Sequence, residues 1–368
     1  MLYVYVAFIA LVVALLALDL GVFHRKAHVI RVREALGWSA FWVALGVSFA
    51  GIIYLGYEHQ WLGLGTGRDT MATPATGADG SPVYNDGSSA AIKYLTGYVM
   101  EKSLAVDNIF VIAMIFTFCR VSAVYQHRVL FWGILGALVM RGAMIGIGAA
   151  LVTRFDWVLY IFGAFLVVTG LKMLRGGDDG IDFERHWFVR GFRRLIPTTA
   201  RYHGPSFWVR AGSPESEQSE VPGGAREPDP IVERARRGAL LATPLLLALL
   251  LVEITDVVFA IDSIPAIFSI TTDPFLVFTS NVFAILGLRS LYFALASMVD
   301  EFRYLKLSLS LVLVVIGTKM LAHDWLHGWL GPNFHYIVLG VVGAILSGGV
   351  IGSLIVRRRA LTPTLGGK

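Results

Sequence analysis

The sequence predicts an all-α polytopic membrane protein of about nine transmembrane helices, with its N-terminus outside and its C-terminus in the cytoplasm. Three observations support this prediction. The apolar residues make up 56% of the chain and the charged residues only 15%, whereas a soluble domain carries about 25% charged residues. Long stretches carry almost no charge. Lys and Arg gather in every second loop between those stretches.

Nine segments are long and apolar enough to span a bilayer, which requires about 20 mostly apolar residues. They cover residues 2–20, 38–57, 92–118, 127–151, 157–174, 238–268, 274–297, 303–322 and 334–356. The first segment has no basic residues before its apolar run, as a signal peptide would, and basic residues follow it instead. We therefore interpret it as a transmembrane helix.

The loops between these segments alternate in charge. Residues 24–33, 119–128, 175–237 and the C-terminal tail are basic, whereas residues 58–91 are acidic and rich in Gly and Ser. Cytoplasmic loops carry an excess of Lys and Arg. This rule gives the predicted orientation.

The domain organisation follows from these segments. We expect two N-terminal transmembrane helices (1–57), an external flexible loop (58–91), a first three-helix repeat (92–174), a basic cytoplasmic linker (175–237), a second, inverted three-helix repeat (238–322), and a last transmembrane helix with a basic cytoplasmic tail (323–368).

Composition also excludes some classes of function. Cys119 is the single cysteine, so the chain holds neither an internal disulfide nor a cysteine-built metal site. The net charge of +5 is explained by the positive-inside rule rather than by nucleic-acid binding. The lipid bilayer is the expected surrounding, and a homo-oligomer is left open.

Both halves of the chain carry the same acidic motif. The segment Glu101–Ile109 (EKSLAVDNI) matches Asp256–Ile264 (DVVFAIDSI) at an offset of 155 residues. One helix later, Arg141 corresponds to Arg289. Two helices later, residues 167–174 match residues 314–321. Because each repeat contains three spans, the second repeat is inverted relative to the first. Inverted repeats are typical of transporters that bind substrate near the membrane midplane; duplication without a transport role is the alternative.

The motif places costly ionisable groups inside apolar spans. A carboxylate at mid-bilayer costs at least about 2.5–3.5 kcal/mol on insertion scales. Several carboxylates in one dry site require protons or a cation, and ligation by oxygen alone favours Mg, Ca or Mn. The candidate metal-binding residues are Glu101, Asp107, Asn108, Glu253, Asp256, Asp262 and Ser263, with Asp19 as an additional candidate on the path.

Two features qualify this site. The acids could instead form inert ion pairs with Arg141, Lys172, Arg289 and Lys319. In addition, positions six apart on a helix point about 120° away from each other, so one regular helix cannot aim every acid at one ion. We therefore predict either a helix break near Asp262–Pro265, where proline removes a backbone donor, or ions at more than one level.

The motifs resemble those of a known family. The patterns Glu101-x-x-Leu104-x-x-Asp107-Asn108 and Glu253-x-x-Asp256-x-x-Phe259-x-x-Asp262-Ser263-Ile264-Pro265 are similar to those of the TerC family, over residues 1–356. The resemblance implies a bacterial inner-membrane protein that exports Mn²⁺ and whose motif acids handle the ion. It also implies a link to tellurite resistance.

The leading hypothesis is therefore a multi-pass secondary transporter of the bacterial plasma membrane that exports Mn²⁺ in exchange for protons. The alternative is a metal-binding membrane scaffold or a tellurite- or stress-resistance component that does not transport. An enzyme is not expected, because the sequence has no HExxH helix. Ca²⁺ stays open as the ion, since it also accepts oxygen ligands.

Overall fold

The computed structural model describes residues 2–21, 32–72, 74–77, 80, 82–155, 157–175, 191, 194, 196–214, 216, 219–220, 229–295, 303–322 and 334–361. The chain divides into two compact units. Unit 1 comprises Met1–Asp107, Leu138–Gly177 and Phe259–Lys368, and unit 2 comprises Asn108–Ala137 and Asp178–Val258.

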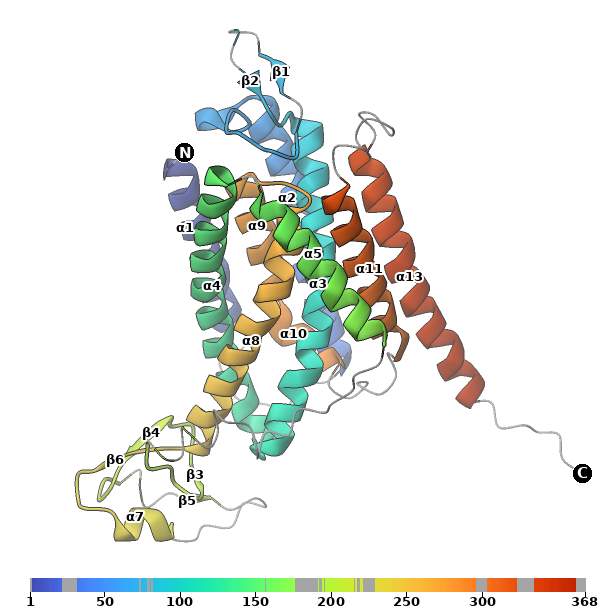
Figure 1. Cartoon of the computed structure of the whole chain (residues 1–368). Coiled ribbons are helices and arrows are strands. Elements are labelled where there is room, and N and C mark those ends of the chain that lie inside the picture. The colour runs from blue at the N-terminus through green and yellow to red at the C-terminus, as the bar shows by residue number, and fades with distance from the viewer. Residues whose placement is uncertain are drawn as a thin grey trace, which may run out of the picture. The chain divides into compact units, whose positions relative to one another are not determined.

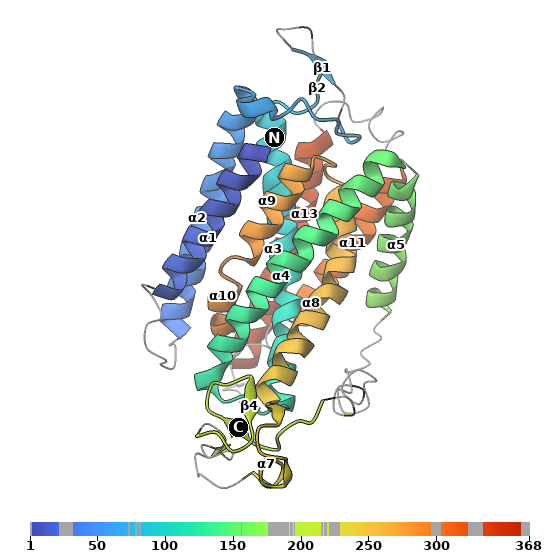
Figure 2. The same cartoon turned by 90° about the vertical axis from the view of Figure 1, so that its left-hand side faces the viewer.

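Long helices dominate the fold, as the sequence predicted (Figures 1 and 2). They are α1 (Leu2–Gly21), α2 (Val32–Glu58), α3 (Gly87–Phe118), α4 (Ala123–Arg154), α5 (Val158–Leu174), α8 (Pro244–Phe268), α9 (Pro274–Ile285), α10 (Leu288–Leu295), α11 (Arg303–Leu321) and α13 (Phe334–Leu361). Helix α11 lies between α5 and α13 in both views.

Among the described residues, four helices are long and apolar enough to cross a membrane: Leu2–Asp19, Arg33–Glu58, Ala123–Arg154 and Pro244–Phe268. The pair α9 and α10, which is bent by 41°, makes a fifth if it is one span. Shorter apolar helices cover Val158–Leu174, Leu307–Leu321 and Gly340–Ser353. Helices thus occupy the predicted positions, but the number nine stays a prediction.

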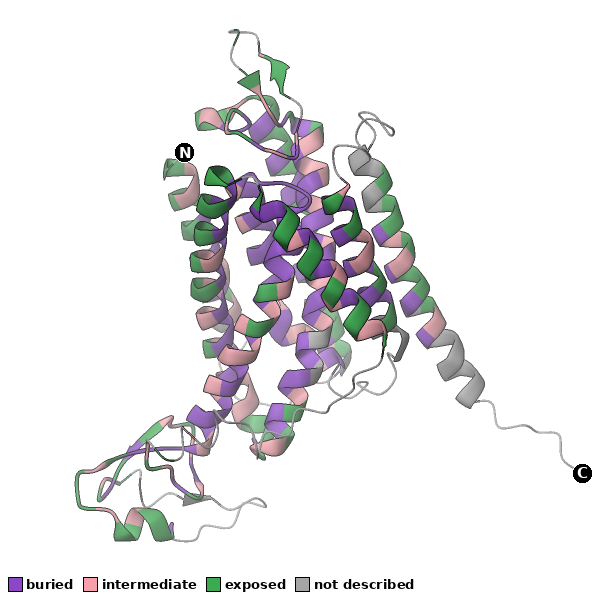
Figure 3. Cartoon of the chain, in the orientation of Figure 1, coloured by how far each residue is buried: buried purple, intermediate pink, exposed green. Residues whose placement is uncertain are grey.

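Many residues on these helices are exposed (Figure 3), and large apolar side chains are common among them. Val139 and Ile147 on α4 are 66% and 69% exposed, and Val168 on α5 is 65% exposed. Exposed apolar side chains along whole helices are unfavourable in water and favourable in lipid. This pattern supports membrane insertion independently of helix length.

The break in the helices lies at Gly287 and not at Pro265. Helix α8 continues through Pro265 to Phe268. Between α9 and α10, the backbone of Leu286 leaves the helical conformation (φ −57°, ψ 129°) and Gly287 has a φ of +82°, a conformation that favours glycine. A Cβ at Gly287 would also lie 2.5 Å from the Trp42 Cβ of α2. The predicted break at Asp262–Pro265 was therefore wrong in position.

Helices α5 and α11 pack through glycines within unit 1. A Cβ on Gly317 would lie 2.7 Å from the carbonyl oxygen of Gly163, and one on Gly170 would lie 2.8 Å from that of Ser310. Small residues allow backbones in membranes to approach this closely. As α5 advances from Gly163 to Gly170, its neighbour on α11 moves back from Gly317 to Ser310, so the two helices run antiparallel.

The fold also contains short strands, which an all-α prediction did not include. They form three two-stranded antiparallel sheets: β1 (Ala75–Thr76) with β2 (Pro82–Val83), β3 (Tyr202–His203) with β5 (Ser219–Glu220), and β4 (Trp208–Arg210) with β6 (Leu240–Ala242). Helix α7 (Pro230–Arg234) and the single-turn helix η1 (Trp61–Gly63) complete the described elements. The predicted span 238–268 therefore starts too early, because residues 240–242 pair as a strand and Pro244 begins the helix.

Candidate functional site

Glu101 is buried in the middle of α3, within unit 1. Its side chain is 1% exposed and its Oε1 forms an ion pair with Arg141 of α4. Its second oxygen, Oε2, is buried and has no hydrogen-bond partner among the described residues. One oxygen of this carboxylate is therefore paired with a cation, and the other is an acceptor without a hydrogen-bond donor in the described part of the chain.

Arg141 also contacts two further helices, α8 and α9. Its Nη1 also donates to Ser263 Oγ of α8 and to Asn281 Oδ1 of α9, each at 3.4 Å. Arg141 is 4% exposed, so this charge lies in an environment of low dielectric. The predicted residues Glu101 and Ser263 thus share one guanidinium. This is the ion pairing that the sequence left as the alternative to a metal site.

The acid of the second motif copy has a different partner. Asp256 of α8 is buried, and its Oδ1 accepts a hydrogen bond of 3.0 Å from Asn108 Nδ2 of α3, within unit 2. Asn108 Oδ1 is buried without a hydrogen-bond partner among the described residues. A neutral amide thus contacts the acid here, where a guanidinium contacts Glu101.

Glu253 lies one helical turn before Asp256 and is partly buried. Its carboxylate packs against the backbone of α4 at Gly136, so closely that a Cβ on that glycine would overlap the carboxylate. The neighbouring Gly133 faces Val252 in the same way, at 3.1 Å from the added Cβ. The glycines of α4 therefore make room for an acid as well as for helix packing.

The other candidates are dispersed. Asp262 is partly buried on α8. The side chain of Asp107 lies outside the described residues. Asp19 of α1 is 2.9 Å from Arg289 Nη2 of α10, so it belongs to an ion pair inside unit 1.

No group of three or more His, Cys, Asp or Glu side chains that could hold a metal ion occurs within the part of the chain that is described. Glu101 and Ser263 meet at Arg141, and Asp256 meets Asn108. A single point shared by all the motif acids stays a prediction.

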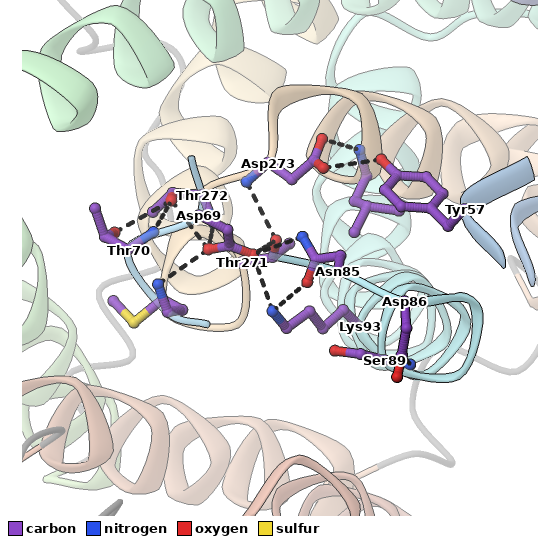
Figure 4. A network of polar contacts seen from close by, with 12 residues as sticks. Tyr57, Asp69, Thr70, Asn85, Asp86, Ser89, Lys93, Thr271, Thr272 and Asp273 are labelled. Carbon is purple, nitrogen blue, oxygen red and sulfur yellow. Dashed lines mark hydrogen bonds and ion pairs between the residues drawn. The ribbon is translucent and has the colours of Figure 1, made fainter. Parts of the chain in front are cut away.

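A second buried polar cluster lies in the segment that was predicted to be a flexible loop (Figure 4). Asp69 Oδ2 accepts from Lys93 Nζ at 2.9 Å, from Thr271 Oγ1 at 2.6 Å and from Asn85 Nδ2 at 3.1 Å. Its Oδ1 accepts from the backbone N–H and the hydroxyl of Thr272 at 2.9 and 3.0 Å. Residues 58–91 are thus fastened at Asp69 to α3 and to the α8–α9 connection. The flexibility of the rest of this loop stays a prediction.

Electrostatics follow from these contacts. Burial by itself raises the pKa of Asp69, but the Lys93 ammonium and the Thr271 and Thr272 donors outweigh it and hold that pKa well below its usual range. Burial and the nearby Asp69 charge raise the pKa of Asp273 to about 6, although Tyr57 donates to it at 2.9 Å. This cluster thus joins two carboxylates whose pKa values are shifted in opposite directions. We call it the outer network, and it comprises Tyr57, Asp69, Asn85, Lys93, Thr271, Thr272 and Asp273.

The sequence held signals for part of this network. Asp273 precedes Pro274 and caps α9, accepting from the backbone N–H of Phe275 at 3.0 Å, and Asp followed by Pro is a helix-start pattern. Lys93 near the start of a predicted span was a second signal, since a charge at that place requires a partner. Nothing local marks Asp69, because its side-chain partners Asn85, Lys93 and Thr271 lie 16, 24 and 202 residues away.

Comparisons with known proteins agree with these features. Residues 86–361 match the integral membrane protein TerC family. A membrane protein of Myxococcus xanthus (STKORF319) is 44% identical over 355 residues, which cover 96% of this chain and 93% of that protein.

Two further relatives are each named as a candidate membrane-bound redox modulator, Alx. The protein from Photorhabdus laumondii is 41% identical over 342 residues, with 93% of this chain and 91% of the relative covered. The protein from Escherichia coli strain K12 is 40% identical over 340 residues, with 92% and 90% covered. No solved structure shows significant similarity to the chain. The chain belongs to the TerC family of integral membrane proteins and is a multi-pass membrane protein.

Proposed function

We propose that this protein is a secondary transporter that exports divalent metal ions, with Mn²⁺ as the cargo, through the acidic residues of its two motif copies. The observation that carries the proposal is the unpartnered Oε2 of Glu101, buried in an apolar helix bundle. A buried carboxylate oxygen without a donor is costly. A cation that binds transiently would satisfy it.

The neighbouring groups suit a hard cation. Ser263 Oγ and Asn281 Oδ1 share Arg141 with Glu101, and all three side chains offer oxygen. Oxygen donors favour Mn²⁺, Mg²⁺ and Ca²⁺. Binding here would compete with Arg141 for Glu101, because both cations use the same carboxylate. In unit 2, Asp256 and Asn108 offer a second set of oxygens, in line with ions at more than one level.

Reciprocal contacts support an inverted repeat. At the offset of 155 residues, Glu101 corresponds to Asp256 and Asn108 to Ser263. Asn108 contacts Asp256 directly, and the equivalent residues Ser263 and Glu101 both contact Arg141. The first pair is in direct contact and its counterpart is bridged by Arg141, so equivalent residues lie near each other in both copies, which supports a two-fold relation between the repeats.

The helix pair α5 and α11 behaves in the same way. Gly170 faces Ser310 and Val314, whereas its counterpart Gly317 faces Gly163 and Val167. Residues 163, 167 and 170 correspond to 310, 314 and 317. Because this pair is antiparallel, we propose that the second repeat is inverted relative to the first.

The proposed topology keeps nine spans with the N-terminus outside. It adds α3 and the shorter helices α5, α11 and α13 to the helices that qualify by length and composition. Helix α3 carries Lys93, Glu101, Lys102 and Asp107, and such charges are tolerated in a span when they face the protein interior. Glu101 and Lys93 are both buried. The inner membrane is the proposed location.

Proton exchange is the proposed driving force. A buried carboxylate accepts either a proton or a cation, so the same group can move one ion inward and another outward. We propose no enzymatic activity. Export of a redox-active ion such as Mn²⁺ would also fit the name that the Alx relatives carry.

One observation favours a second function. The Glu101–Arg141 pair is closed and buried, as it would be in a metal-binding scaffold or a tellurite- or stress-resistance component that does not transport. In that case Arg141 stays in place and the pair serves only to hold α3 against α4.

Mn²⁺ efflux from proteoliposomes under a pH gradient separates the two functions. We expect Glu101→Gln and Asp256→Asn, and likewise Asp107→Asn and Asp262→Asn, to abolish the flux. The matched control is Glu233→Gln, an exposed acid on α7, which should leave the flux unchanged. Intact flux in all four motif variants would refute the proposed site. Mn²⁺ binding without flux in the wild type would favour the scaffold.

A further inference from the structure

The β4–β6 sheet of unit 2 has one exposed face that is both apolar and basic. Trp208 and Arg210 alternate along β4 with the buried Val209, so they share a face. Leu240 pairs with Arg210 in register and is 53% exposed, while Trp208 is 42% exposed. The face thus exposes an aromatic, an aliphatic and a cationic side chain together.

Two more arginines lie next to this face. Arg236 and Arg237 are exposed in the turn that leads into β6. That turn is fixed to β4, because the Gly238 N–H donates to the Ala211 carbonyl at 2.8 Å. The residues Trp208, Arg210, Arg236, Arg237 and Leu240 are called the basic hairpin face. Glu233 is an exposed acid on α7 earlier in the chain.

This face is tied to the start of a membrane-spanning helix. Strand β6 ends at Ala242 and α8 begins at Pro244 (Figure 1). Between them, Thr243 is fully buried and its hydroxyl donates to the Ser206 carbonyl at 2.8 Å. At about 3.3 Å per residue, Leu240 lies within roughly 13 Å of the helix start. The face therefore lies close to the start of a helix that is long and apolar enough to cross a membrane.

Two further contacts attach this part of unit 2 to the ends of other helices, one through Phe207 next to β4 and one through Tyr202 of β3. The Arg128 guanidinium of α4 lies 5.2 Å from the Phe207 ring centroid, and the Tyr202 hydroxyl donates to the Cys119 carbonyl just after α3. The ends of α3, α4 and α8 thus all contact residues in or next to these short strands, which keeps the β4–β6 sheet close to the start of α8.

We propose that the basic hairpin face binds the phosphate headgroups of anionic phospholipids in the leaflet where α8 begins. Arginine matches phosphate with two parallel donors. Trp and Leu partition into the interfacial region of the bilayer, so the lipid contacts both the charged and the apolar parts of the face. Basic residues at this depth attract anionic lipids, and the occupant follows from this charge complementarity.

The test uses the full-length protein in bilayer discs made from phosphatidylcholine with about one third phosphatidylglycerol. Native mass spectrometry counts the phosphatidylglycerol molecules that stay bound after release. We expect Arg210→Gln/Arg237→Gln to weaken this retention on the order of tenfold. The matched control, Arg68→Gln/Arg154→Gln, removes the same charge from exposed positions in unit 1 and should retain lipid like the wild type. Equal losses in both pairs would overturn the proposal.

A second readout does not depend on how the arginine variants fold. Brominated phospholipids quench the fluorescence of tryptophans that they touch. The difference in fluorescence between the wild type and Trp208→Phe gives the signal of Trp208 alone. We expect this difference to be quenched more by brominated phosphatidylglycerol than by brominated phosphatidylcholine. Equal quenching by the two lipids, or none, would refute the proposed binding. Arg210→Lys/Arg237→Lys should restore part of the retention, because it restores the charge without the two parallel donors.

Discussion

Two buried carboxylates of unit 1 are satisfied to very different degrees. Asp69 in the outer network accepts hydrogen bonds on both oxygens, from Lys93, Asn85, Thr271, Thr272 and the backbone of Met71. Glu101 in the motif has one oxygen on Arg141 and another without a partner among the described residues.

This difference separates a structural role from a functional one. A fully satisfied buried network makes its region rigid and specific. A partly satisfied one has a free-energy cost that a proton or a bound cation can remove. We therefore infer that Asp69 holds the loop of residues 58–91 in place, and we propose that Glu101 handles an ion.

The largest effect is expected at Asp69. The substitution Asp69→Asn leaves the Lys93 ammonium buried without its counter-charge, which should destabilise the protein by about 3–5 kcal/mol. Thermal unfolding in detergent measures this loss. The control Asp86→Asn in the same loop keeps the cap on α3, where the Asp86 side chain accepts from the Ser89 N–H, and should unfold like the wild type. If Asp69→Asn unfolds at the wild-type temperature, Asp69 does not have the structural role that distinguishes it from Glu101.

Arg141→Gln should have a somewhat smaller effect, about 3 kcal/mol, because it leaves Glu101 buried without its guanidinium. Unlike Asp69→Asn, this variant should be rescued by Mn²⁺, since the ion replaces the lost positive charge. Saturation at about 100 times the dissociation constant adds about 2.7 kcal/mol. Unfolding with and without Mn²⁺ tests this, and Arg141→Lys is the charge-preserving control. No Mn²⁺-dependent shift in Arg141→Gln would contradict an ion-handling role for Glu101.

Substitutions at two glycines of α4 test whether the Glu253 carboxylate lies against that helix. Gly136→Ala places a methyl group on the Glu253 carboxylate and should cost about 1–3 kcal/mol. Gly146→Ala on the same helix meets nothing within 4 Å. It should stabilise the helix by about 0.5–1 kcal/mol. Unfolding temperatures that shift in the same direction in both variants would show that the carboxylate does not lie against α4.

The smallest effect concerns pH. Burial raises the pKa of Asp273 to about 6, so the folded state binds a proton that the unfolded state has already released. Stability from this group is full below its ordinary pKa and is lost as pH rises to about 6. Asp273→Asn keeps the cap on α9 and should be more stable than the wild type by on the order of 1 kcal/mol above pH 6, with no difference near pH 4. Unfolding temperatures from pH 4 to 8 check this, and a constant difference across that range would contradict it.

Much of the fold follows from local pattern. The helices lie where apolar segments of spanning length predicted them, because a helix satisfies its backbone internally in lipid. The motif residues and the family could also be predicted from the sequence, since they depend on residue type and spacing. The strand before Pro244 and the break at Gly287 were missed, because both depend on neighbours distant in sequence, namely β4 and Trp42.

The candidate site was predictable only in part. Residue types alone selected Glu101, Asn108, Asp256 and Ser263. They did not decide that Arg141 binds Glu101 while Asn108 binds Asp256, because the rotation and depth of each packed helix set these pairs.

The sequence by itself determined that the chain is a helical membrane protein with a repeated acidic motif, since hydropathy, charge and spacing are properties of short segments. Only the tertiary structure decided which carboxylates are satisfied. Asp69 meets Thr271 across 202 residues, and Glu101 meets Arg141 across 40. A hydrogen bond requires two groups within about 3 Å, and packing alone brings residues so distant in sequence to that separation.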